Sequence, residues 1–119
     1  MSANFSQIRK TIVSFSKLEL GWDGYQGEPI NDEVINFAIE LIPHLPKQTE
    51  AFPLNFGAIQ LECENDGHDY FELVVMPNRI LELFIVWSNG EPFQKTICYD
   101  NGPERSVLFD FVAQFQRRE

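Results

Sequence analysis

Residues 58–76 read AIQLECENDGHDYFELVVM, and their pattern sets the architecture of the chain. Apolar and polar residues alternate from Ile59 to Cys63, and a second run of this kind covers Tyr70–Met76. A period of two residues predicts half-buried strands, because successive side chains of a strand point to opposite faces. Asn65-Asp66-Gly67 between the two runs is typical of a hairpin turn. The stretch therefore predicts two antiparallel strands.

Two more strands are predicted downstream at short spacing. Ile80–Trp87 is nearly all apolar and is interrupted by Glu82, which is typical of a strand covered at least in part on both faces. Phe93–Tyr99 is predicted as the next strand. The connections contain Pro77-Asn78 and Ser88-Asn89-Gly90, and such short turns favour an antiparallel meander of four strands.

The segments that flank this meander have a helical period. Apolar residues recur at steps of three or four between residues 4 and 19, at Phe5, Ile8, Ile12, Phe15 and Leu18. A second helix is predicted from an N-cap at Asn31 to the residue before Pro43. A last helix is predicted to begin at Pro103. Residues 47–55, which contain Pro53, are expected to form a loop.

The order of these elements predicts one α+β domain over residues 1–119. It consists of two N-terminal helices, a four-stranded antiparallel meander and a C-terminal helix, with the helices on one face of the sheet. A chain of this length buries roughly two-thirds of its unfolded surface, which is enough for a single hydrophobic core.

The chain is acidic, and the acidity is concentrated in its middle. It has 18 acids, 9 bases and a net charge of −9. Residues 19–91 hold 14 of these acids against only Lys47 and Arg79, a net charge of −12. This balance argues against direct binding of nucleic acid or of an anionic membrane. Two interpretations remain: a solvated face that keeps the chain soluble, or a docking surface for a basic partner.

Nothing in the sequence predicts export or a membrane span. The first ten residues lack the apolar run of a signal peptide, and every later apolar run is short and broken by charge. Cys63 and Cys98 both fall in predicted strands. We expect a cytoplasmic protein with two reduced thiols, and a cross-strand disulfide is the alternative.

Acidic residues around the first hairpin are the candidates for chemistry. Glu62 and Glu72 are candidates for a general acid and base across the hairpin. Glu62, Glu64, Asp66 and Asp69 are a separate candidate site for a hard cation such as calcium or magnesium. The sequence shows no nucleophile–base pair, no glycine-rich phosphate loop and no spacing of a calcium loop. We therefore expect surface carboxylates rather than an active site, and neither a metal nor a cofactor.

The segment Trp22-Asp23-Gly24-Tyr25 is the most distinctive local motif. In a structural interpretation Asp23 accepts hydrogen bonds from the following backbone amides, and the two aromatic side chains fix the connector to the sheet. In a functional interpretation Trp22 and Tyr25 are an exposed anchor for a partner, because Trp and Tyr dominate binding hot spots. Trp87 at the end of a strand presents the same two alternatives.

Residues 20–86 resemble a family of small, largely uncharacterised bacterial proteins of the accessory genome. The resemblance rests on Gly21-Trp22-Asp23-Gly24-Tyr25, the helix start at Pro29-Ile30, and strands such as Ile59-Gln60-Leu61-Glu62 and Tyr70-Phe71-Glu72-Leu73. This chain departs from the family pattern at Cys63, where an aromatic residue is common. The resemblance implies a role in conflicts between toxins, phages and hosts.

Together these features predict a non-catalytic, acidic interaction protein. It would bind and inhibit a protein with a basic surface, such as a nuclease or another nucleic-acid-binding protein. Antitoxins, immunity proteins and phage-encoded inhibitors of defence systems, such as anti-CRISPRs, are of this kind. The predicted partner-binding residues are Trp22, Asp23, Tyr25, Glu62, Glu64, Asp66, Asp69, Glu72 and Trp87. The alternatives are a homodimer or larger oligomer joined at an open sheet edge, and a carboxylate-based hydrolase.

Overall fold

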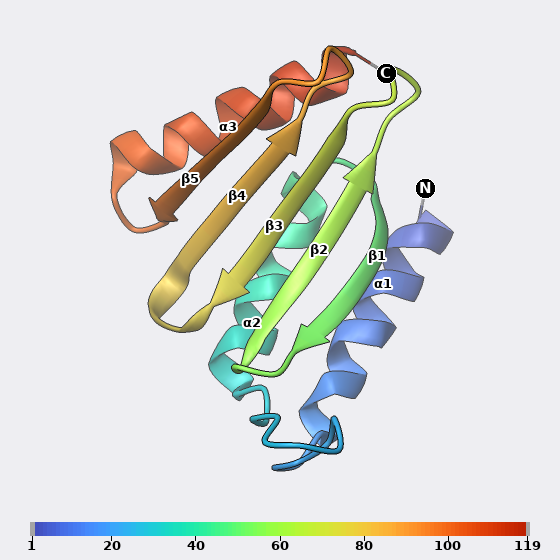
Figure 1. Cartoon of the computed structure of the whole chain (residues 1–119), viewed down its shortest axis with the longest axis vertical. Helices are drawn as coiled ribbons and strands as arrows, with labels where there is room; N and C mark the ends of the chain where they lie inside the picture. The colour runs from blue at the N-terminus through green and yellow to red at the C-terminus, as the bar shows by residue number, and fades with distance from the viewer. Residues whose placement is uncertain (1, 119) are drawn as a thin grey trace.

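The computed structural model describes residues 2–118 and has two layers, a sheet and a layer of helices (Figure 1). Helices α1 (Ser2–Ser14) and α2 (Asp32–Leu41) precede the sheet, and α3 (Gly102–Arg117) follows it. All three helices lie behind the sheet in the view of Figure 1. The strands are β1 (Gln48–Leu54), β2 (Ala58–Glu64), β3 (Tyr70–Met76), β4 (Ile80–Val86) and β5 (Pro92–Cys98).

The sheet is an antiparallel meander in the order β1-β2-β3-β4-β5. The α+β class and the order of helices are as the sequence predicts, but the number of strands is five and not four. The error lies in residues 47–55, which were expected to form a loop and contain β1. The register of β1 shifts between Gln48 and Glu50, and the strand contains Pro53. Pairing with β2 makes this segment a strand although its own sequence lacks regular alternation, and proline is tolerated because β1 is an edge strand.

The core lies between the helices and one face of the sheet. Leu61, Leu73 and Leu83 occupy one row across β2, β3 and β4, and all three are fully buried. Phe71 of β3 meets Phe115 of α3 edge to face, with ring centroids 5.4 Å apart. Burying a side chain of this size stabilises the folded state by about 1.5–3 kcal/mol.

The opposite face of the sheet has no helix over it in the described chain. Along β4 the residues alternate, so that Leu81, Leu83 and Ile85 are buried whereas Ile80 and Phe84 are half-buried. The sequence predicts a strand covered at least in part on both faces, and the structure places the helix layer against one face only. Packing of the core does not explain why β4 also has apolar side chains on its uncovered face.

Both edge strands have features that oppose the addition of a further strand. Pro53 in β1 and Pro92 in β5 have no backbone N–H to donate. The N–H of Cys98 in β5 donates to a carboxylate oxygen of Glu104, at 2.8 Å, and not to a strand. These are means by which natural sheets block edge-to-edge association.

The β3–β4 turn holds the sheet against α2. Asn78 and Arg79 both have positive φ, 65° and 59°, as a tight hairpin turn of this kind requires. The Arg79 guanidinium lies 4.4 Å from the ring centre of Phe37 on α2. It also forms ion pairs with Glu40, at 3.4 Å, and with Asp100, at 2.9 Å.

Two asparagines at helix N-termini give a test of this description. Asn101 Oδ1 accepts from the Glu104 N–H at 3.0 Å, whereas the side chain of Asn31, the predicted N-cap of α2, forms no capping bond. We expect Asn101→Ala to lower the free energy of unfolding by about 1 kcal/mol. Asn31→Ala is the matched control and should lower it by less, as measured by urea denaturation. Equal losses would contradict the assignment of these two caps.

Candidate functional site

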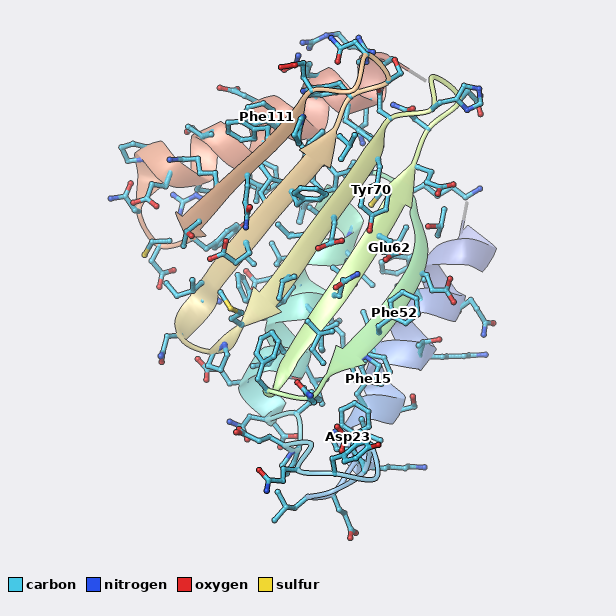
Figure 2. The ribbon with its side chains drawn as sticks, in the orientation of Figure 1. Phe15, Asp23, Phe52, Glu62, Tyr70 and Phe111 are labelled. Carbon is cyan, nitrogen blue, oxygen red and sulfur yellow. The ribbon has the colours of Figure 1, made fainter. Side chains whose placement is uncertain are left out.

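Five glutamates, Glu50, Glu62, Glu64, Glu72 and Glu82, point to the uncovered face of the sheet, which we call the open face, and Glu62, Glu72 and Glu82 are its central acids. The open face consists of those residues of the five strands whose side chains point away from the helices. Glu62 on β2 is directly opposite Glu72 on β3, and Glu82 on β4 is opposite Val74, next to Glu72 along β3. Figure 2 shows Glu62 on the side of the sheet turned away from the helices, together with Tyr70 and Phe52. The three central acids thus occupy adjacent strands.

Each of these carboxylates accepts a hydrogen bond from a neutral donor. The Tyr70 hydroxyl donates to Glu72 Oε1 at 2.7 Å, and Thr96 Oγ1 donates to Glu82 Oε2 at 2.6 Å. Gln60 Nε2 donates to Glu62 Oε2 at 2.8 Å. A neutral donor orients a carboxylate and leaves its negative charge uncompensated.

No base of residues 2–118 forms an ion pair with these three acids. The ion pairs in this range join Arg79 to Glu40 and Asp100, and Arg118 to Asp69. The strand positions on the open face contain no Lys or Arg. Lys95 of β5 is opposite the buried Leu83, so it lies on the helix side of the sheet. The open face therefore has a negative potential without internal compensation.

Tyr70 is part of this arrangement as a proton donor. Burial of the hydroxyl, followed by the carboxylates of Glu72 and Glu62, raises the pKa of Tyr70 above its ordinary value. The hydroxyl stays protonated at every physiological pH, so it continues to donate to Glu72. The ring meets Phe84 edge to face, with centroids 6.4 Å apart. The carboxylates are thus set among half-buried aromatic side chains.

The motif loop at residues 21–28 is fixed by its own hydrogen bonds. Asp23 Oδ1 accepts from the backbone N–H groups of Tyr25 and Gly27, both at 2.9 Å. These amides lower the pKa of the Asp23 carboxyl, and the Tyr25 amide contributes most. The indole N–H of Trp22 donates to the Glu28 carbonyl oxygen at 2.7 Å. Asp23 therefore fixes the loop, as the structural interpretation of the motif predicts. Trp22 bonds within the loop, and Tyr25 is exposed and does not fix the connector to the sheet.

Tyr25 is the part of the motif that this rigid loop exposes. It is 86% exposed. Leu20, just before the loop, is 75% exposed, and Phe56 in the β1–β2 turn is 53% exposed. Tyr25 and Asn55 line one shallow hollow, which places the loop beside that turn. An exposed aromatic side chain on a fixed backbone loses little conformational entropy when it binds, as an interface anchor requires.

Asp69 is placed differently from the other predicted acids. It is 1% exposed, and its carboxylate accepts from the Ser88 N–H at 2.6 Å and from the Asn65 side chain at 3.0 Å. Arg118 at the end of α3 completes the site with an ion pair at 2.6 Å. Because it is buried and bonded within the chain, Asp69 is not available to a partner. It holds two turns and the end of α3 together.

The other predicted residues lie near this buried ion pair, at the end of the sheet away from the motif loop. Trp87 is half-buried, and the Arg118 guanidinium lies 5.2 Å from its ring centre. Glu64 and Asp66 are exposed at the end of β2 and in the turn that follows. Of the nine predicted residues, the structure places Glu62, Glu64 and Glu72 on the open face, with Glu62 and Glu72 directly opposite each other, and separates them from the Trp22–Tyr25 motif.

The sequence analysis did not assign a binding role to several residues of the open face, among them Glu50, which is opposite Glu62. Glu82, Phe84 and Phe52 lie there with Glu62 and Glu72. The alternation within β4 was the available signal for two of them, because Glu82 and Phe84 are two residues apart and must share a face. Phe52 had no such signal, since β1 was expected to be a loop.

Comparison of the chain with protein-family models, with curated proteins and with solved structures gives no match. In residues 2–118 no group of three or more His, Cys, Asp or Glu side chains has the arrangement to hold a metal ion. Within the same range no helix is both long enough and apolar enough to cross a membrane. Inference about function therefore rests on the open face and the motif loop.

The opposed pair Glu62–Glu72 gives a direct test of the open face. Like charges directly opposite on neighbouring strands destabilise a sheet. We expect Glu72→Gln to raise the free energy of unfolding by about 0.5 kcal/mol, because glutamine still accepts from Tyr70 and the repulsion is removed. The gain should shrink at high salt. Glu91→Gln, in an exposed turn, is the control in urea denaturation, and an equal gain there would show a bulk charge effect.

The buried Asp69–Arg118 pair predicts a pH dependence. The hydrogen bond from Arg118 is the largest of the effects that lower the pKa of Asp69 to about 2, below its ordinary value of 3.8. A lowered pKa means that the ionised form is favoured by folding, so the stabilisation is present above pH 3.8 and is lost as the pH falls toward 2. We expect Arg118→Ala to lower the free energy of unfolding near neutral pH, because it removes the charged partner of the buried Asp69 carboxylate.

Arg117→Ala is the matched control for this pair, because the neighbouring arginine is exposed. Urea denaturation at several pH values should show the difference between the two variants closing in acid. A difference that does not change with pH would contradict the role assigned to Asp69.

Proposed function

We propose that this chain is a non-catalytic interaction protein that binds a basic surface of another protein through its open face. The observation that supports the proposal is the set of three central acids, Glu62, Glu72 and Glu82, which lie on adjacent strands and form no ion pair with a base of residues 2–118. Half-buried apolar side chains surround them, which a purely solubilising face does not need.

The charge acts before and after contact. At a distance, the negative face attracts a basic partner and raises the association rate, and this effect weakens with salt. In contact, Phe52, Phe84 and Tyr70 are covered by the partner, which contributes the apolar part of the binding energy. Tyr25 on its rigid loop offers a further apolar contact at one end of the molecule.

Binding through the open face is expected to inhibit the partner, because the basic surface that an acidic face fits commonly has a function of its own. A concentrated basic surface on a protein is commonly a site for nucleic-acid phosphates. A protein that covers this surface excludes the nucleic acid by direct competition. Antitoxins, immunity proteins and phage-encoded inhibitors of defence nucleases are classes that act in this way. The resemblance of residues 20–86 to accessory-genome proteins favours the same classes.

The structure offers less support for self-association as the function. Both edge strands contain proline, and the Cys98 N–H at the β5 edge is engaged by Glu104. Two copies that met through their open faces would bring the same carboxylates together, because a two-fold interface pairs identical patches. Association through an edge strand is thus opposed by the prolines, and association through the open face is opposed by repulsion between carboxylates.

A charge-matched pair of variants tests the proposal. Glu62→Gln, Glu72→Gln and Glu82→Gln are combined in one face variant. The control combines Glu19→Gln, Glu91→Gln and Asp110→Asn, three exposed acids off the open face, and has the same net charge. Each is used as bait in extracts of the native host, and captured proteins are challenged with duplex DNA. We expect wild type and control to retain a basic protein that DNA displaces, and the face variant to lose at least tenfold in capture.

Two results would overturn the proposal. Equal loss by both variants would mean that bulk charge and not the open face attracts the protein. Undiminished capture by the face variant would mean that the open face is not the docking surface. Circular dichroism and urea denaturation of each variant establish that it is folded.

A further inference from the structure

The open face is not flat between β3 and β4. A groove of about 390 Å³ lies there, and it extends to Gln94 on β5 and to Phe56 of the β1–β2 turn. Its apolar lining comes from Val74, Met76, Phe56 and Phe84, and Glu72 and Glu82 contribute carboxylates. The groove therefore combines an apolar floor with two acids, which is unlike the rest of the acidic surface.

The strand register sets these groups in a fixed arrangement. Glu72 is opposite Phe84, and Val74 is opposite Glu82. The two carboxylates thus stand at diagonal corners of a four-residue array, with apolar side chains at the other two corners. Diagonal neighbours on a sheet are about 7–8 Å apart, which leaves room for one planar cation between them.

We propose that this groove binds a single arginine side chain of the partner, an inference that rests on the proposed function and names the group that the open face recognises. The aliphatic stem of an arginine would lie on Val74 and Met76, and its guanidinium would lie on the Phe84 ring between the two carboxylates. Long basic side chains bury an apolar stem while their charged end stays at a polar rim. The groove provides both parts.

The arrangement favours arginine over lysine. A guanidinium is planar, stacks on an aromatic ring and donates in two directions, whereas an ammonium is a compact, strongly hydrated charge. Tyr70 and Thr96 engage Glu72 Oε1 and Glu82 Oε2. These bonds orient the carboxylates, and a carboxylate accepts several hydrogen bonds, so both can also accept from a guanidinium.

Blocked tripeptides test the groove without the partner. The full chain, labelled with nitrogen-15, is titrated with acetyl-Gly-Arg-Gly-amide and followed by NMR. We expect shifts confined to the amides of β3, β4 and β5 around the groove. The lysine tripeptide should bind several-fold more weakly. The citrulline tripeptide, a neutral isostere of the arginine one, should cause no shifts. Uniform shifts at acids across the surface, or equal binding of all three peptides, would overturn the inference.

Variants of the groove separate this inference from the proposed function. Glu82→Gln keeps an acceptor for Thr96 and should weaken the arginine peptide roughly tenfold. Phe84→Leu keeps an apolar floor and should reduce the preference for arginine over lysine. Glu64→Gln, an exposed acid of β2 that does not line the groove, is the control and should bind normally. Unaltered peptide binding by Glu82→Gln would refute the groove, whereas the proposed function is overturned by the capture experiment, through undiminished capture by the face variant or equal loss by the face variant and its control.

Discussion

The register of the antiparallel meander is the constraint on which the rest of the structure depends. It sets Leu61, Leu73 and Leu83 in one buried row across three strands. Because a strand alternates its side chains, the next residues along these strands must lie on the other face. A slip of one residue would bring glutamates into the core and leucines into water. The hydrophobic core and the acidic open face are therefore two consequences of one register, and neither can change without the other.

The open face is maintained against its own electrostatics. Glu62 and Glu72 repel each other, and the donors that reach them are neutral. The two arginines that form ion pairs within residues 2–118 lie elsewhere, at the two ends of the meander. Arg79 joins the β3–β4 turn to α2, and Arg118 joins the end of α3 to the buried Asp69. The arginines stabilise the framework, while the face between these two ends keeps its charge. The proposed binding function accounts for a surface that is costly to the fold and forms no ion pairs with the described bases.

Most of the fold could be predicted from periodicity, and the exceptions have physical causes. The hairpin over residues 58–76, the helices and their order follow from patterns of period two and 3.6. β1 was missed because an edge strand with a bulge and Pro53 has no regular pattern, and pairing with β2 forms it. Asp69 was expected at the surface because it is charged, and its burial depends on Arg118, 49 residues away in sequence. Glu82 was read as an interruption of an apolar strand, and its place beside Glu72 depends on register.

The sequence by itself determined that the chain is acidic, that it has an α+β order of elements with an antiparallel meander, and that its helices and turns lie where periodicity and turn residues place them. These properties are local, since composition, alternation and turn residues act over a few neighbours. Only the tertiary structure decided which acids share a surface, which one is buried, and where the groove lies. Such properties depend on which strands pair, in what register, and on which side the helices pack. Those choices minimise exposed apolar area over the whole chain, and no short segment contains the information to make them.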